Sequence, residues 1–143
     1  MRNLNPEGLG DFLDQAKCAI LATHFRDGRV LLSPVWHEWR DGGFTVVLTA
    51  AGAPARHITR EPRMSIIVAE DVPPYRGIEV RGKAKRVPGD VHQIVHRMAL
   101  RYLGAEHGPA FAATASQIES VVLRIEPGEL RVWDLADEPD LIA

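Results

Sequence analysis

The segment from Thr49 to Arg56, TAAGAPAR, contains residue types that suit a phosphate-binding turn. Thr49 offers a hydroxyl group, and Arg56 offers a forked cation that matches phosphate oxygens. The residues between them are small: Ala50, Ala51, Gly52, Ala53, Pro54 and Ala55. Small residues let a ligand approach the backbone, and the start of a following helix has unpaired N–H groups. An ordinary helix start with a solvated arginine explains the same residues, so spacing alone leaves both interpretations open.

Histidines at helical spacing are the second candidate for chemistry. His92 and His96 are four residues apart on an expected helix, and His107 follows them. Two imidazoles at that spacing can share one zinc ion. However, no glutamate lies between them to act as a base, and no third ligand is close in the sequence. We therefore expect a surface helix and no metal site.

Nucleophilic catalysis has little support in the sequence. The serines in question lack the context of a nucleophile elbow: Ser33, Ser65, Ser116 and Ser120. Cys18, the only cysteine, lies in an apolar run and is expected to be a small, buried core residue. No catalytic residue is assigned from the sequence.

Composition limits the classes of protein to which the chain can belong. Its 143 residues, of which 45% are hydrophobic, are enough for one domain with a core. The net charge of −2 gives no electrostatic reason to expect nucleic acid or an anionic membrane as a partner. The N-terminus has no apolar signal region, and no apolar run approaches the ~20 residues that span a bilayer. We expect a soluble, cytoplasmic protein.

Alternating apolar residues and turn signals predict six or seven antiparallel strands and a few helices. The expected strands cover 17–24, 29–39, 44–49, 64–69, 77–87, 120–126 and 129–135, with turns at Asp27-Gly28 and at Asp41-Gly42-Gly43. The expected helices cover 7–15, 54–60, 90–103 and 109–115. Short strands with helices inserted late indicate a mainly β fold with α decoration, of the small-barrel type.

The order of several short motifs resembles one superfamily. These motifs are PVW (34–36), DGG (41–43), RxxxREPR (56–63), PPYRG (73–77) and EVRG (79–82). Together they are similar to the pyridoxamine 5'-phosphate oxidase-like split β-barrel superfamily, and within it to the actinobacterial flavin/deazaflavin-dependent oxidoreductases. The resemblance covers about residues 7–133.

This resemblance implies a six-stranded antiparallel split β-barrel, formed by one domain over residues 1–143 and working as a homodimer. A helical insert would cover about 90–115 and a C-terminal tail 136–143. The cofactor, FMN or the deazaflavin F420, would lie in a groove between the subunits. Residues expected to contact it are Ser33, Pro34, Val35, Trp36, Thr49, Ala50, Ala51, Gly52, Pro54 and Arg56. Tyr75, Arg76 and Trp133 would line the substrate side, from the same or from the other subunit.

The chain departs from the family pattern at the expected phosphate site. Members that hold the phosphate usually place basic residues just before the position of Arg56, where this chain has only small residues. Two functions therefore remain open. One is an F420- or FMN-dependent oxidoreductase that transfers hydride to a small unsaturated or quinone-like acceptor. The other is a non-catalytic protein that binds a flavin or a tetrapyrrole.

Overall fold

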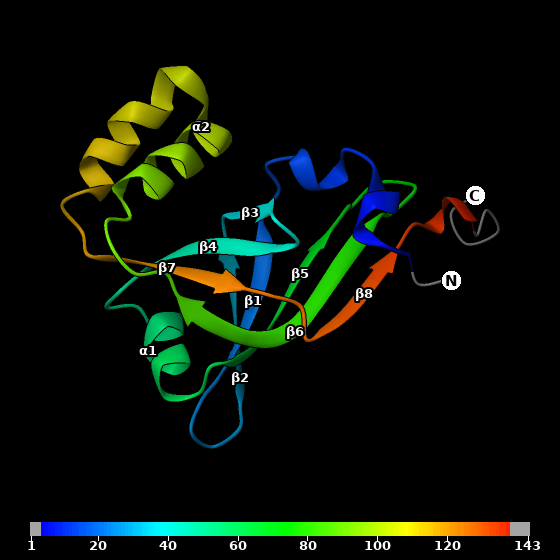
Figure 1. The fold of residues 1–143 in the computed structure, drawn as a ribbon, viewed down its shortest axis with the longest axis horizontal. Coiled ribbons are helices and arrows are strands. Elements are labelled where there is room, and N and C mark those ends of the chain that lie inside the picture. The colour runs from blue at the N-terminus through cyan, green and yellow to red at the C-terminus, as the bar shows by residue number, and fades with distance from the viewer. Residues whose placement is uncertain (1–3, 138–143) are drawn as a thin grey trace.

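The computed structural model describes residues 4–137, which form a mainly β fold of eight strands and two helices (Figure 1). The strands are β1 (Ala19–His24), β2 (Val30–Val35), β3 (His37–Arg40), β4 (Gly43–Thr49), β5 (Arg63–Ala69), β6 (Gly77–Arg86), β7 (Ser120–Ile125) and β8 (Glu129–Trp133). The helices are α1 (Ala53–Arg60) and α2 (His92–Ala115), and the 3-10 helices are η1 (Pro6–Leu9), η2 (Phe12–Asp14) and η3 (Leu135–Asp137). The predicted tail, 136–143, lies outside the described residues from position 138 onward.

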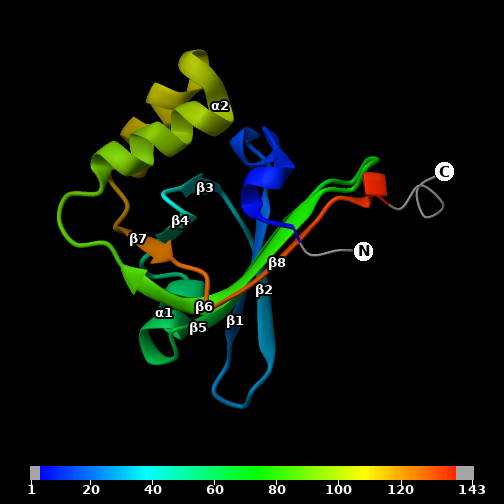
Figure 2. The same ribbon diagram turned by 45° about the vertical axis from the view of Figure 1, so that its right-hand side comes forward.

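The strands pair in the order β2-β1-β5-β6-β7-β4-β3, and β8 pairs with β6. All pairs are antiparallel, and the sheet curls into a half-barrel (Figures 1 and 2). The two predicted turns are confirmed. Gly28 has φ 88° between β1 and β2, whereas Asp41 and Gly42 have φ 52° and 75° between β3 and β4. Asp-Gly sequences suit such turns because both residues tolerate positive φ.

The strand predicted over 29–39 is divided at Trp36, which is why the structure has eight strands. β2 pairs only with β1, in one half of the sheet, and β3 pairs only with β4, in the other half. The chain must bend where it passes from one half to the other. Sequence alternation alone does not contain this bend, because both halves continue the same apolar pattern.

β6 connects the two halves of the fold. Residues 77–81 pair with β8 and residues 84–86 with β7, while β5 pairs along the opposite edge. Gly82 lies where the β7–β8 connection crosses β6. A Cβ atom there would lie 2.7 Å from the carbonyl oxygen of Glu126, so any side chain would force the backbone apart. The crossing therefore requires glycine.

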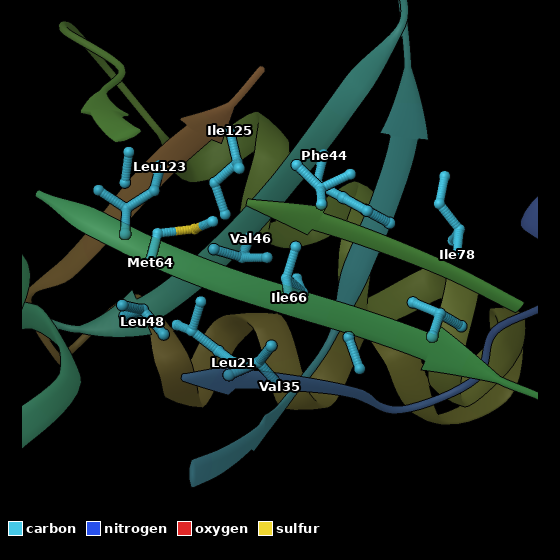
Figure 3. Close-up of a cluster of buried hydrophobic side chains, with 14 of the residues drawn as sticks. Leu21, Val35, Phe44, Val46, Leu48, Met64, Ile66, Ile78, Leu123 and Ile125 are labelled. Carbon is cyan, nitrogen blue, oxygen red and sulfur yellow. The ribbon is translucent and has the colours of Figure 1, made fainter. Parts of the chain in front are cut away.

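The core lies inside the curl and is built from alternate residues of the strands. Leu21, Phe44, Val46, Ile66 and Ile125 are at most 1% exposed (Figure 3). Helix α1, which follows β4, closes one end of the core. There the Nδ1 atom of the buried His57 lies 2.9 Å from the hydroxyl oxygen of Thr23. Burial lowers the pKa of His57, and the charges of Arg60 and Arg56 lower it further.

The predicted N-terminal helix over 7–15 is wrong, because two short 3-10 helices replace it. Gly10 separates η1 from η2 with φ 61° and ψ −126°, a conformation outside any helix. Leu9, Phe12 and Leu13 of this stretch are nevertheless buried. Glycine flexibility within a nine-residue stretch outweighed the amphipathic pattern.

α2 is a folded-back pair of helical segments between β6 and β7. Gly104, with φ 77° and ψ 177°, interrupts the helix where the sequence predicts a stop. The second segment packs back on the first, and a Cβ atom at Gly108 would lie 3.0 Å from the backbone of Ala99 and Leu100. We call residues 92–115 the helical hairpin; it stands beside β3, β4 and β7 (Figures 1 and 2). Within residues 4–137, no helix is long and apolar enough to cross a membrane.

Candidate functional site

A cavity of about 560 Å³ lies between the sheet and the helical hairpin. We call it the apolar pocket. Its first side, the barrel wall, is formed by Cys18, Ser33, Pro34, Val35, Trp36, Val47, Leu48, Thr49, Gly52, Pro54 and Ser120. Its second side, the hairpin wall, is formed by Val95, Met98, Phe111, Ala115 and Ile118. The volume is typical of pockets that bind small organic molecules.

Most of the predicted cofactor residues meet in this pocket. Ser33 to Val35 end β2, Trp36 follows directly, and Thr49 ends β4 beside them. Gly52 and Pro54 lie at the start of α1 and complete the same rim. Strand order thus brings together residues that are distant in sequence.

Three predicted residues do not line the apolar pocket: Ala50, Ala51 and Arg56. The amide of Ala50 donates to the carbonyl of Glu119 at 2.9 Å, so it is used within the fold. The exposed guanidinium group of Arg56 donates to the carbonyl oxygen of Ala51, and so it folds back over the turn. Contact between these residues and a cofactor remains a prediction.

The start of α1 offers few groups to an anion. Its N-cap, Gly52, makes no side-chain capping bond, and its amide donates to the carbonyl of Thr49 at 3.0 Å. Pro54 has no N–H group. Helix geometry leaves the amides of Ala53 and Ala55 without a partner inside the helix. An anion here would therefore depend on two backbone amides and on Arg56.

Cys18 was expected in the core but is exposed and lines the apolar pocket. Cys18 immediately precedes β1, so it does not belong to the set of alternate strand residues that includes the buried Ala19 and Leu21. The pocket's other polar side chains are the hydroxyls of Ser33, Thr49 and Ser120, and none of the described lining residues is charged. The pocket suits a largely uncharged ring system that needs a few hydrogen-bond partners.

Trp36 links the two walls. Its ring stacks on Tyr102 with centroids 4.7 Å apart and an interplanar angle of 7°, and lies 5.1 Å from Phe111. Trp39 packs edge-on against the core residue Phe44 at 4.9 Å. Trp36 thus faces the candidate site, whereas Trp39 packs toward the core.

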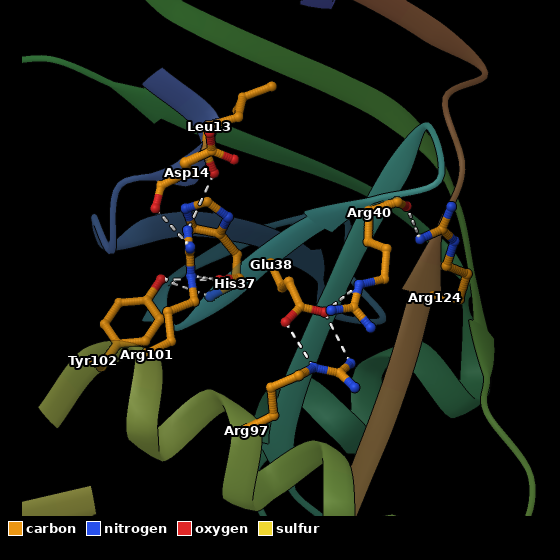
Figure 4. Close-up of polar contacts among 9 residues, drawn as sticks. All are labelled: Leu13, Asp14, His37, Glu38, Arg40, Arg97, Arg101, Tyr102 and Arg124. Carbon is orange, nitrogen blue, oxygen red and sulfur yellow. Dashed lines mark hydrogen bonds and ion pairs between the residues drawn. The ribbon is translucent and has the colours of Figure 1, made fainter. Parts of the chain in front are cut away.

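The hairpin wall is held by polar contacts between the first segment of α2 and the sheet (Figure 4). The guanidinium of Arg97 donates to both carboxylate oxygens of Glu38 at 2.8 and 2.9 Å. Arg101 donates to the carbonyls of His37, Leu13, Asp14 and Gln15 at 2.7–3.2 Å. The Tyr102 hydroxyl accepts from the amide of His37 at 2.8 Å and donates to the carbonyl of Lys17 at 2.7 Å. We call these three residues, Arg97, Arg101 and Tyr102, the polar clamp.

His37 lies beneath the polar clamp and is fully buried, with neither ring nitrogen hydrogen-bonded. Burial, followed by the charge of Arg101, lowers its pKa to about 4. A neutral imidazole is therefore built into the base of the hairpin wall. Its ring packs edge-on against Phe44, with centroids 5.3 Å apart.

The residues predicted for the substrate side do not line the apolar pocket. Arg76 is paired with the buried carboxylate of Glu70 at 2.6 Å. Trp133 covers Gly77, where a Cβ atom would lie 2.2 Å from the indole ring, and Tyr75 is at a surface turn with φ 58°. A role for these residues at the site of a second chain remains a prediction.

The hairpin wall was not predicted from the sequence. None of its lining residues was among the expected contact residues: Val95, Met98, Phe111, Ala115 and Ile118. The pair Gly104 and Gly108 was the available signal, since it marks a helix that folds back at close range. Within residues 4–137, no three His, Cys, Asp or Glu side chains cluster as metal ligands.

The chain matches one family model and several solved structures. A family model described as "Pyridoxamine 5'-phosphate oxidase" matches residues 6–134. The conserved hypothetical protein Rv2991 from Mycobacterium tuberculosis is similar, with a TM-score of 0.76, 25% identity, and 95% of this chain and 88% of that chain covered. A structure described as an F420 reductase is similar with a TM-score of 0.71, 26% identity, and 88% and 98% covered.

A third similar structure is HutZ, the heme storage protein from Vibrio cholerae. It has a TM-score of 0.71 and 23% identity, with 92% of this chain and 95% of that chain covered. At this level of identity the likeness extends to the fold alone. A search of curated proteins gave no match.

Proposed function

The chain belongs to the pyridoxamine 5'-phosphate oxidase family, and from this premise we propose that its apolar pocket holds the ring of FMN or F420. The protein would be an oxidoreductase that transfers hydride to a small unsaturated or quinone-like acceptor. The observation that carries the proposal is that seven of the predicted contact residues line one cavity of about 560 Å³. Similarity to an F420 reductase supports the same class of cofactor.

The residues of the pocket fit such a ring. The end of β2 supplies backbone and the hydroxyl of Ser33 on one side, and Thr49 supplies a second hydroxyl. The hairpin wall would cover the ring with the apolar side chains of Met98, Phe111 and Ile118. When bound, the cofactor supplies the hydride chemistry, and the chain's task is to orient the ring and to exclude competing reactions.

Arg56 and the amides at the start of α1 would hold the cofactor's phosphate. The side chain of Arg56 is exposed and, among the described residues, bonds only to the carbonyl of Ala51, so it can turn toward an anion. A charge-assisted contact contributes about 1.5–3 kcal/mol, which is roughly ten- to hundred-fold in affinity. We expect Arg56→Ala to weaken cofactor binding at least ten-fold without unfolding the protein.

The direct experiment is a fluorescence titration of FMN and of F420 with the purified chain. Saturable quenching of one of them at micromolar ligand, weakened in Arg56→Ala and unchanged in the matched control Arg26→Ala, supports the proposal. Arg26 is equally exposed but lies in the β1–β2 turn. Absence of quenching with both ligands would refute it. Equal affinity of wild type and Arg56→Ala would show that the phosphate is held elsewhere.

A homodimer is part of this proposal. The outer face of β1 and β2 exposes apolar side chains in register, with Ala22 opposite Leu32 and Ile20 opposite Pro34. Leu32 is 65% exposed, Val30 52% and Ile20 37%. Pro34 also lines the apolar pocket, so this face is continuous with the pocket rim. Contiguous apolar surface of this kind typically marks an interface.

A second chain on this face would complete the groove and bring Tyr75, Arg76 or Trp133 toward the acceptor. Light scattering is the test of the dimer. We expect wild type to be dimeric and Leu32→Glu to be monomeric, with Arg29→Glu on the same hairpin as control. If the wild type is monomeric at micromolar concentration, a second chain does not contribute residues to the site.

A second candidate function is binding without turnover. It is favoured by a specific observation, namely that no charged side chain of the described residues lines the pocket. In addition, the small residues 52–55 stand where basic residues are expected before Arg56. Tight binding of a flavin or a tetrapyrrole, with no reduction of any quinone-like acceptor under reducing conditions, would support a carrier over a reductase.

A further inference from the structure

A second cavity, lined by cationic side chains, lies at the opposite end of β1 from the apolar pocket. Cys18, just before β1, lines the apolar pocket, whereas His24, at the end of β1, lines the second cavity. This cavity measures about 820 Å³. We call it the cationic cleft, and its basic residues are Arg63, Arg81, Lys83 and Lys85.

The cationic cleft places like charges directly opposite one another on adjacent strands. Arg63 on β5 is the register partner of Lys83 on β6, and both are exposed. Lys85 is likewise the register partner of Arg124 on β7, which does not line the cleft and whose guanidinium donates to the carbonyls of Arg40 and Asp41. Like charges in this arrangement destabilise a sheet. Nothing in the packing requires them, because these side chains lie outside the core.

The acidic residues nearby neutralise only part of this charge. Glu61 accepts from Arg63 at 3.0 Å, and Arg81 lies 3.5 Å from Glu79 and 3.8 Å from Glu129. By contrast, Lys83 and Lys85 form no ion pair and no side-chain hydrogen bond with any other described residue. Two ammonium groups therefore point toward solvent beside two partly paired guanidinium groups.

The facing wall of the cationic cleft is fixed by two close backbone approaches. The amide of Gly128 donates to the carbonyl of Arg81 at 3.0 Å, and neither Gly128 nor Gly82 has room for a Cβ atom. The β7–β8 turn thus stands rigidly over the strand that carries the lysines. Glu126 and Glu129, on either side of this turn, also line the cleft.

We propose that the cationic cleft binds a small oligophosphate, such as the diphosphate or triphosphate group of a nucleotide-like ligand. Arg81, Lys83 and Lys85 alternate along β6, so neighbouring cations are spaced by about 6–7 Å and the row extends over about 13 Å. One orthophosphate cannot contact the whole row, whereas linked phosphates can. A long nucleic acid is not expected here, because two carboxylates also line the cleft and the chain is negative overall.

The proposal does not depend on a cofactor in the apolar pocket. Its test is isothermal titration of the full chain with inorganic tripolyphosphate, pyrophosphate, orthophosphate and citrate. We expect one tripolyphosphate per chain, bound more tightly than orthophosphate and more weakly at high salt. The double variant K83Q/K85Q should bind it at least ten-fold more weakly. The control R26Q/R86Q removes the same charge from exposed sites that do not line the cleft, and it should stay within two-fold of wild type.

The variant Lys83→Glu distinguishes a loss of tripolyphosphate binding from a loss of stability. An opposite charge facing Arg63 should raise the melting temperature by about 1–4 °C while it abolishes tripolyphosphate binding. FMN and F420 titrations on the same variant report separately on the apolar pocket. Absence of saturable binding, equal loss in K83Q/K85Q and in R26Q/R86Q, or equal affinity for citrate would overturn the proposal. So would loss of a dimer in K83Q/K85Q with unchanged tripolyphosphate affinity, because a second chain would then be the occupant.

Discussion

The two walls of the apolar pocket are built in different ways. The barrel wall consists of strand ends that are fixed by backbone pairing, β1 to β2 and β4 to β7. The hairpin wall belongs to an inserted helix pair, and its attachment depends on side chains, above all on the polar clamp. The first wall thus depends on backbone pairing and the second on side-chain contacts, so we expect substitutions to alter ligand choice and stability mainly at the hairpin wall.

The largest expected difference between the walls is in their response to acid. His37 has a folded pKa of about 4, below the usual 6.5, so the folded state binds fewer protons than the unfolded state between these values. The contribution of the neutral His37 to the free energy of unfolding is fully present above pH 6.5 and is lost as the pH falls toward 4. The shift of about 2.5 units corresponds to about 3 kcal/mol.

Urea denaturation at pH 7.5 and 4.5 measures this loss. His37→Leu should reduce the pH dependence, whereas His92→Gln, on an exposed part of the helical hairpin, should leave it unchanged. An unaltered pH dependence in His37→Leu would mean that other groups cause the acid response and that the base of the hairpin wall is not its origin.

The next effect concerns Arg101, whose guanidinium donates hydrogen bonds to carbonyl groups of η2, of the loop that follows η2, and of β3. Arg101→Lys keeps the charge but loses the planar fork, and we expect it to destabilise the protein by about 1–3 kcal/mol. Chemical denaturation measures the change, with Arg86→Lys as the control on an exposed strand position. A cost below about 0.5 kcal/mol would show that the hairpin wall is held by packing alone.

The fold could largely be predicted from the sequence because its signals are local. Asp27-Gly28 and Asp41-Gly42 fix two turns, and alternation predicts most strands. The site could be predicted only for the barrel wall, since the ends of β2 and β4 follow from strand order. Phe111 escaped prediction because its position depends on where α2 folds back, which is a tertiary contact between Gly108 and Ala99. Cys18 was wrongly expected in the core because it adjoins an apolar strand, although it lies one residue before β1.

The smallest expected effect compares one residue from each wall. Phe111 is 45% exposed and packs on Trp36, so Phe111→Ala should cost about 1 kcal/mol and alter the fluorescence of Trp36. Ser33→Ala on the barrel wall should change stability by less than about 0.5 kcal/mol, because no core packing is lost. Thermal unfolding followed by tryptophan emission measures both. If Phe111→Ala and Ser33→Ala had the same stability and the same tryptophan emission, the proposed difference between the two walls would be wrong.

A crystal structure of the chain soaked with FMN or F420 tests the central proposal most directly. We predict that the ring lies between the two walls, against Ser33 to Trp36 and under Phe111, with its first phosphate at the start of α1 beside Arg56. A ring bound elsewhere on the chain, or an apolar pocket without ligand at saturating concentrations of both cofactors, would contradict the account.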